Sequence, residues 1–195
     1  MHYATLASCA EPEHPKEQVT DLSPTTANEN TPTITASAFT SALSLAANGV
    51  CVVTTTHDEV DTGLTVSSMC SVCADPALVL ICVNSDNEFC DMALGSGHFA
   101  VNILPSSCVE LAMVFAGLVE ELTNTRFDIG VWTRLTTGSP ILSDALVALD
   151  CVVESEQVHG THRVFFGKVV DVRTTSGEPL IYTDRRFAVV EPVPL

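Results

Sequence analysis

Basic side chains are scarce in this 195-residue sequence, which has 8 Lys and Arg against 24 Asp and Glu and a formal net charge of −16. Nucleic acids and anionic lipids are bound through clustered Lys and Arg, so both are excluded as expected partners. Long apolar runs are also lacking, and none reaches the ~18 residues that a membrane helix needs. The opening residues show no basic segment followed by an apolar one, so we expect no secretory signal and a cytoplasmic protein.

Several common chemical motifs are also missing. No G-x-G-x-x-G follows a strand, which argues against a doubly wound dinucleotide fold. His159-x-x-His162 has no nearby thiol or carboxylate cluster at ligand spacing, so no metal site is expected. Cys70-x-x-Cys73 has the spacing of a redox motif, but it falls in a predicted strand, where residues three apart face opposite sides. We therefore expect the cysteines to be free thiols without redox function.

The sequence divides into a polar beginning and an apolar remainder. Residues 1–33 are rich in Pro, Thr, Ser, Asn and Glu and have few large apolar groups, which predicts a disordered acidic tail. Residues 34–195 are predicted to form one domain, since hydrophobic residues make up 46% of the chain.

Short runs rich in β-branched residues dominate this domain, with few helical patterns between them. Helical patterns are predicted at 36–47, 87–94 and 109–115. Strands are predicted at 50–56, 64–72, 78–83, 99–104, 146–156, 163–172 and 180–190, with a Gly160 turn making a hairpin. Many strands and short turns favour a closed antiparallel barrel, and a β-sandwich is the alternative.

An ordered series of segments resembles one known family across residues 39–187. The series comprises Gly49-Val-Cys-Val-Val-Thr-Thr55, Gly63-Leu-Thr-Val-Ser-Ser-Met-Cys-Ser-Val72, Asp75-Pro76-Ala-Leu-Val-Leu-Ile-Cys-Val83, Ser96-Gly-His-Phe-Ala-Val-Asn-Ile-Leu104, Phe115-Ala-Gly117, Gly138-Ser-Pro-Ile-Leu142, Leu149-Asp-Cys151, Gly160-Thr-His-Arg-Val-Phe-Phe-Gly167 and Pro179-Leu-Ile-Tyr182. Together they resemble the flavin reductase-like, FMN-binding split-barrel family. The resemblance implies a mainly β fold, a six-stranded antiparallel split barrel of Greek-key type with a few short helices.

The same resemblance implies an activity and a set of site residues. It implies an NAD(P)H-dependent reductase of FMN or FAD, acting as a homodimer that supplies reduced flavin to a partner monooxygenase. His162 would serve the nicotinamide or the reduced flavin as the catalytic residue, or be a solvated turn histidine. Cofactor contacts are implied for Thr65, Val66, Ser67, Ser68, Asn84, Asn87, Glu88, Asn102 and Ser106. Asn102 could equally be a satisfied polar group in the core.

The sequence departs from the family pattern where relatives hold the flavin phosphate. Asn87-Glu88-Phe89 stands where relatives carry a basic residue between hydroxyls, and Met113-Val114 replaces a basic pair. A carboxylate repels a phosphate, so these positions support an alternative function. In that alternative the barrel no longer binds flavin and is a cofactor-independent cyclase or isomerase, or a small-molecule binder.

Overall fold

The computed structural model describes residues 32–191 and 193, and the chain divides into two units, residues 1–35 and 36–195. The tail predicted over residues 1–33 lies almost wholly outside the described residues, so that boundary stays a prediction. No described helix is both long enough and apolar enough to cross a membrane. All the described helices and strands belong to the second unit.

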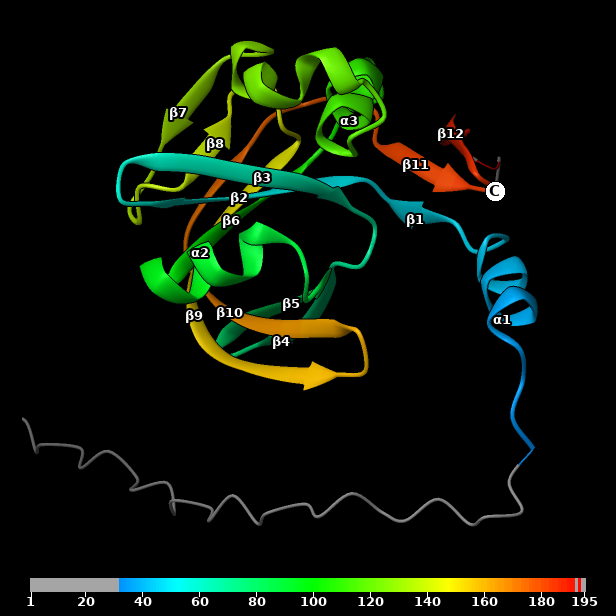
Figure 1. Ribbon diagram of the computed structural model, residues 1–195. Helices are drawn as coiled ribbons and strands as arrows, with labels where there is room; N and C mark the ends of the chain where they lie inside the picture. The colour runs from blue at the N-terminus through cyan, green and yellow to red at the C-terminus, as the bar shows by residue number, and fades with distance from the viewer. Residues whose placement is uncertain (1–31, 192, 194–195) are drawn as a thin grey trace, which may run out of the picture. The chain divides into compact units, whose positions relative to one another are not determined.

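Strands far outnumber helices in this unit (Figure 1). The helices are α1 (Ala36–Leu43), α2 (Glu88–Ser96) and α3 (Val109–Phe115), with 3-10 segments η1 (Ser106–Cys108) and η2 (Glu120–Asp128). The strands are β1 (Asn48–Gly49), β2 (Cys51–His57), β3 (Val60–Val66), β4 (Cys70–Ala74), β5 (Ala77–Asn84), β6 (His98–Ile103), β7 (Trp132–Arg134), β8 (Pro140–Leu142), β9 (Val147–His159), β10 (His162–Thr174), β11 (Leu180–Thr183) and β12 (Arg186–Val189).

The main sheet runs in the order β3-β2-β6-β9-β10-β5-β4, and every neighbouring pair is antiparallel. Its two outermost strands, β3 and β4, follow each other in the sequence. Inside the curled sheet lies a core in which the Phe165 ring meets Phe89 and Phe99 edge-on, with ring centroids 6.1 and 6.3 Å apart. The prediction of a mainly β, antiparallel fold is confirmed.

The strand count differs from the expected six because one predicted strand is interrupted. Residues 64–72 were expected to form a continuous strand, but residues 67–69 belong to no strand and separate β3 from β4. The sheet therefore has seven strands among the described residues. The Ser68 hydroxyl donates to the Cys82 carbonyl at 2.7 Å and accepts from the Cys82 N–H at 3.3 Å, so a side chain replaces the strand pairing there.

The predicted placement of Cys70 and Cys73 on opposite faces of a strand is wrong. Cys70 pairs with Leu80 and Cys73 with Leu78, because a register shift between Ser71 and Cys73 inserts one extra residue. Leu78 and Leu80 are two residues apart and share a face, so the two exposed cysteines share one as well. Both thiols are free, as expected.

Candidate flavin site at the break between β3 and β4

A cavity of about 330 Å³ opens where the ends of β3, β5 and β10 meet. Its walls contain six of the ten predicted site residues together with three that were not predicted. The lining residues are Leu64, Thr65, Val66, Ser67, Ser68, Cys82, Val83, Asn84 and His162. Residues almost 100 positions apart in the sequence therefore share one cavity, because β5 pairs with β10 and the chain leaves β3 directly beside them.

The break at residues 67–69 leaves hydrogen-bond donors free. Among the described residues, the backbone N–H groups of Ser67 and Ser68 have no recorded acceptor, and neither has the Ser67 hydroxyl. Ser67 is exposed. Thr65 differs from it, because its hydroxyl donates to the Ala112 carbonyl at 2.8 Å and ties β3 to α3. The free donors therefore lie at the break itself and not along β3.

His162 and Asn84 stand on the opposite wall. They are register partners, His162 being the first residue of β10 and Asn84 the last of β5. The His162 Nδ1 atom lies 3.0 Å from the Thr161 hydroxyl oxygen, while Nε2 has no partner within residues 32–191. The Asn84 Oδ1 atom accepts the Asp86 N–H at 3.0 Å, which leaves the two N–H donors of its amide nitrogen available to a ligand.

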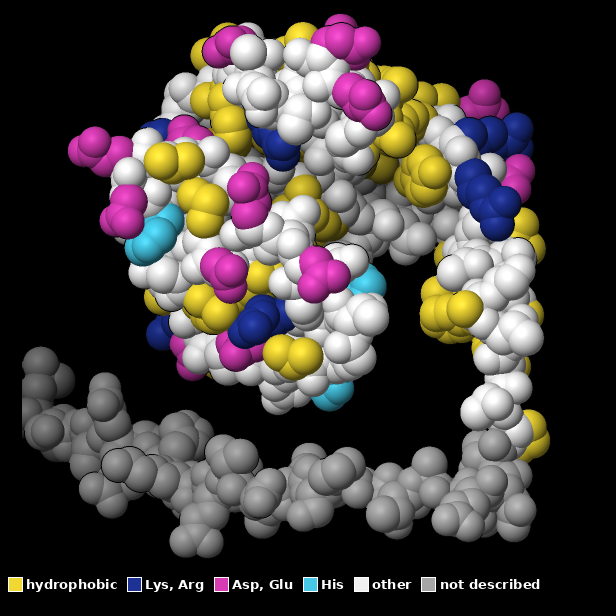
Figure 2. Space-filling model, in the orientation of Figure 1, with side chains coloured by type: hydrophobic (Ala, Val, Ile, Leu, Met, Phe, Trp, Pro, Cys, Tyr) yellow, Lys and Arg dark blue, Asp and Glu magenta, His cyan; other side chains and the backbone are white. Residues whose placement is uncertain are grey.

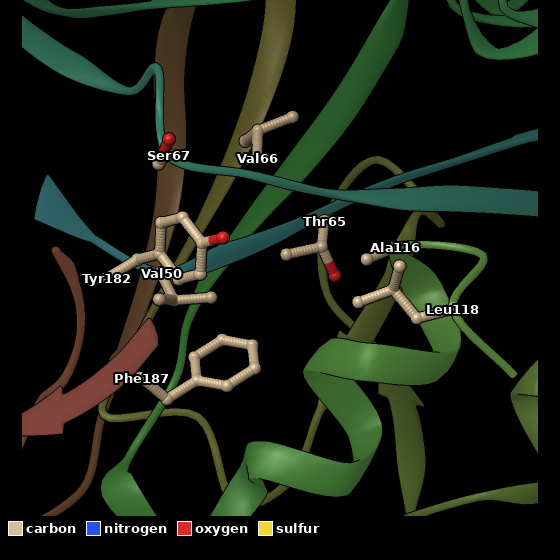
Figure 3. Close-up of a pocket in the computed structure, with 8 residues that line it drawn as sticks. All are labelled: Val50, Thr65, Val66, Ser67, Ala116, Leu118, Tyr182 and Phe187. Atoms are coloured by element: carbon tan, nitrogen blue, oxygen red, sulfur yellow. The ribbon is translucent and has the colours of Figure 1, made fainter. Parts of the chain in front are cut away.

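Two further cavities meet the same break from the other side. One of about 190 Å³ is shown in Figure 3, where the rings of Tyr182 and Phe187 lie across from Thr65 and Leu118. The other, of about 420 Å³, lies between α1 and the barrel and is also lined by Ser67, Ser68 and Tyr182. Ser67 thus borders all three cavities. The sequence predicts Cys82 as a small core hydrophobe, whereas the structure places it half-buried in the cavity wall. It predicts no site role for Tyr182 or Phe187.

Two predicted contact residues lie away from the cavity. Asn102 has no exposed surface, and its amide nitrogen donates to the Val52 carbonyl at 3.1 Å while its oxygen accepts the Leu142 N–H at 2.8 Å. Asn102 is therefore a satisfied polar group of the core, which is the alternative that the sequence left open, because a ligand contact requires an accessible atom. Ser106 begins η1, and its N–H donates to the Glu178 carbonyl at 2.8 Å. Neither side chain lines the cavity.

Asn87 and Glu88 lie beside the cavity at the start of α2. Asn87 is the N-cap of α2, and its side chain accepts the Phe89 N–H at 3.0 Å. The Glu88 carboxylate accepts the Thr62 hydroxyl at 3.0 Å, which ties α2 to β3. Neither residue is among those that line the cavity.

Phe89 and Val114, two of the other residues that depart from the family pattern, have structural roles. Phe89 and Val114 have no exposed surface, and Phe89 packs in the barrel core. A side chain in that position cannot contact a phosphate. Burial also raises the pKa of the Cys82 thiol, so this wall of the cavity is neutral at physiological pH. The cavity thus combines apolar walls with neutral donors.

This donor set fits the edge of a flavin ring. The N5, O4 and N3 edge of the isoalloxazine offers mainly hydrogen-bond acceptors, which free N–H and hydroxyl groups satisfy, and the flat ring fits between apolar walls. The fold and cavity therefore define a split β-barrel with a candidate ligand site that is lined by hydrogen-bond donors and by no Asp, Glu, Lys or Arg side chain.

Comparison with known proteins gives the family. The family model described as "Flavin reductase like domain" matches residues 43–191, and the chain belongs to this family. The chain is similar to "FMN reductase (NADH) RutF" of Pseudomonas syringae pv. syringae (strain B728a), with 35% identity over 151 residues, 77% of this chain and 84% of the relative. It is also similar to "FMN reductase (NADH) RutF 2" of Methylorubrum extorquens (strain PA1), with 36% identity over 158 residues, 80% of this chain and 91% of the relative.

Solved structures agree with this assignment. The flavin reductase PheA2 in its native state matches 82% of this chain and 100% of its own, with a TM-score of 0.76 and 29% identity. BorF, the flavin reductase component of a bacterial two-component tryptophan halogenase, matches 82% of this chain and 100% of its own, with a TM-score of 0.74 and 27% identity.

Proposed function

We propose that this protein is an NAD(P)H-dependent flavin reductase that binds the flavin ring at the break between β3 and β4. The observation that carries the proposal is the set of unpaired donors at Ser67 and Ser68 in a cavity that also contains His162. The relatives named FMN reductase (NADH) support the same reaction. A bound flavin would supply the acceptor for a hydride from the reduced nicotinamide.

The chain's own residues bind and orient the reactants. The Ser67 and Ser68 N–H groups and the Ser67 hydroxyl would hold the polar edge of the ring. The Ser68 hydroxyl keeps these donors in place, because it is bound to Cys82 of β5. The Asn84 amide nitrogen would hold a hydroxyl of the ribityl chain. His162 has Nδ1 beside the Thr161 hydroxyl, so its Nε2 atom would hold or deliver a proton at the cavity wall.

Flavin-dependent NADH oxidation by purified protein tests the proposal. Ser67→Ala removes the free hydroxyl and should raise the dissociation constant of the flavin about fivefold, the value of one hydrogen bond. Ser71→Ala, an exposed serine on β4 outside the cavity, is the matched control. The proposal is overturned if the wild-type protein oxidises neither NADH nor NADPH with added FMN, FAD or riboflavin.

We further propose a homodimer that delivers reduced flavin to a monooxygenase. Apolar side chains of the two further cavities remain in water in the single chain: Leu43, which lines the 420 Å³ cavity, is 53% exposed, and Leu118, which lines the 190 Å³ cavity, is 66% exposed. A second copy would cover them. The structural relatives include BorF and the flavin reductase of a styrene monooxygenase, which supports an oxygenase partner. Sedimentation analysis gives the mass in solution, and a monomer at micromolar concentration would contradict the dimer.

The alternative of a cofactor-independent enzyme or binder has less support. It depended on Glu88, Phe89, Met113 and Val114. Of these, Phe89 and Val114 are buried core residues and Glu88 bonds Thr62, so each has a structural role that does not require a new ligand. The free donors at the break do not depend on those four positions.

A further inference from the structure

The described basic side chains are held away from the cavity. Of the 8 Lys and Arg, Lys16 lies outside the described residues. Arg134 pairs with Asp61 at 2.7 Å, and Arg163 pairs with Glu156 at 2.9 Å. Arg163 follows His162 on β10 and therefore points to the other face of the strand.

The remaining described cations also lie outside the cavity walls. Arg126 donates to the Gly63 carbonyl, and Arg173 donates to the Leu142 carbonyl. Lys168 pairs with Leu78, at the opposite end of β5 from Asn84. Arg185 and Arg186 lie at the β11–β12 turn, where Figure 2 shows Lys and Arg side chains gathered. None of these seven residues lines the 330 Å³ cavity.

The segment that follows Asn84 is acidic, and most of its backbone donors are already used: acceptors are present for the N–H groups of Ser85, Asp86, Asn87, Phe89 and Cys90. Asp86 and Glu88 are exposed carboxylates that follow the cavity residue Asn84. At the start of α2, the Asn87 side chain accepts the Phe89 N–H and the Asn87 carbonyl accepts the Cys90 N–H. The cap residue thus occupies the position where a helix N-terminus would bind an anion. A phosphate there would meet repulsion and find few free donors.

We infer that the site recognises its flavin through the ring and the ribityl hydroxyls alone, so that riboflavin, the phosphate-free flavin, is the preferred substrate. This inference rests on the proposed function. The phosphate of FMN carries about two negative charges at neutral pH. In this site those charges would lie beside Asp86 and Glu88, and Arg163, whose charge reaches Cys90 in the first turn of α2, is already paired with Glu156. Riboflavin presents the same ring and ribityl chain without that repulsion.

Steady-state NADH oxidation with riboflavin and FMN at two ionic strengths tests the inference. The expected ratio of kcat/KM for FMN to kcat/KM for riboflavin is below one at low salt, and it should rise with salt because screening weakens repulsion. A ratio above one, or a ratio that falls with salt, would overturn the inference while leaving the reductase function intact. Absence of turnover with every flavin would instead overturn the proposed function.

Variants test whether the carboxylates of Asp86 and Glu88 cause the preference for riboflavin over FMN. The double variant Asp86→Asn, Glu88→Gln removes both charges, and the introduced glutamine keeps an oxygen that can accept the Thr62 hydroxyl. It should raise the FMN-to-riboflavin ratio about threefold or more. Glu59→Gln, at the exposed turn at the other end of β3, is the matched control and should leave the ratio unchanged. An unchanged ratio in the double variant, or a ratio that falls in Arg185→Ala, Arg186→Ala, would contradict the inference.

Discussion

The Ser68 hydroxyl forms two hydrogen bonds with the backbone of Cys82, donating to its carbonyl at 2.7 Å and accepting from its N–H at 3.3 Å. These bonds attach the segment between β3 and β4 to β5 without a strand ladder. Without a ladder, the N–H groups of Ser67 and Ser68 find no acceptor in the part of the chain that the structure describes. One side chain therefore links the fold of the split barrel to the donors of its site.

Ser68→Ala should release this segment. We expect the free energy of unfolding to fall by about 1–2 kcal/mol, because two hydrogen bonds with a half-buried backbone are lost. Flavin affinity should fall as well, since the donors at Ser67 and Ser68 lose their fixed position. Denaturant titration and flavin fluorescence quenching measure the two effects, with Ser71→Ala as the control. An unchanged affinity would mean that the segment holds its shape without Ser68.

His162→Ala should slow hydride transfer more than it weakens flavin binding. We expect the rate of flavin reduction in single turnover to fall at least about 10-fold, because the loss of a positioned proton-holding group affects the reaction step. The matched control is His159→Ala. His159 pairs with His162 across the same hairpin and does not line the cavity. If binding falls as much as the rate, the role of His162 is only to shape the cavity.

Asn102→Leu should act on stability. The change leaves the buried Leu142 N–H without an acceptor and removes a donor from the Val52 carbonyl, at a cost of about 2–4 kcal/mol. Asn48→Ala, an exposed asparagine on β1, is the control for thermal or denaturant unfolding. If the folded Asn102→Leu protein bound flavin more weakly than wild type, the assignment of Asn102 to the core alone would be wrong.

Stability should depend on His98 below neutral pH. Burial lowers the pKa of His98, opposed in part by the charge of Asp150, and Nδ1 lies 2.7 Å from the Ser139 hydroxyl oxygen. The unfolded chain binds a proton at a higher pH, near the ordinary value of about 6.5, than the folded one does. Folding stability is therefore full above that value and falls as the pH decreases toward the lowered pKa.

Denaturant midpoints measured from pH 8 down to pH 5 test this dependence. We expect His98→Asn, which keeps a polar group near Ser139, to show a smaller loss of stability on acidification than wild type. His159→Asn changes an exposed histidine and should leave the slope as it is. Equal slopes for wild type and His98→Asn would contradict the prediction.

Much of the fold was predictable because runs of β-branched residues are typical of β-strands. The runs at Val50–Thr56 and Leu78–Val83 correspond closely to β2 and β5. The turn between β11 and β12 was missed. Asp184 and Arg185 both have positive φ and split the expected strand 180–190 into β11 and β12. Sequence signals for such turns depend on Gly or Asn, which are absent there.

The site was predictable only where the resemblance supplied it. Thr65 to Ser68, Asn84 and His162 do converge on one cavity, but alternation alone could not reveal that the strand breaks at Ser67. That break depends on a tertiary contact with Cys82, 14 residues away. The functional role of each of these residues stays a prediction that the variants above test.

Amide chemical shifts on flavin addition test the central claim most directly. With uniformly labelled protein, titration with oxidised riboflavin or FMN should move the backbone N–H signals of Ser67 and Ser68 most, followed by those of Asn84 and His162. Signals from the β7–β8 hairpin should stay in place. Binding that leaves Ser67 and Ser68 unmoved, or no binding at all, would contradict the assignment of the flavin site to the break between β3 and β4.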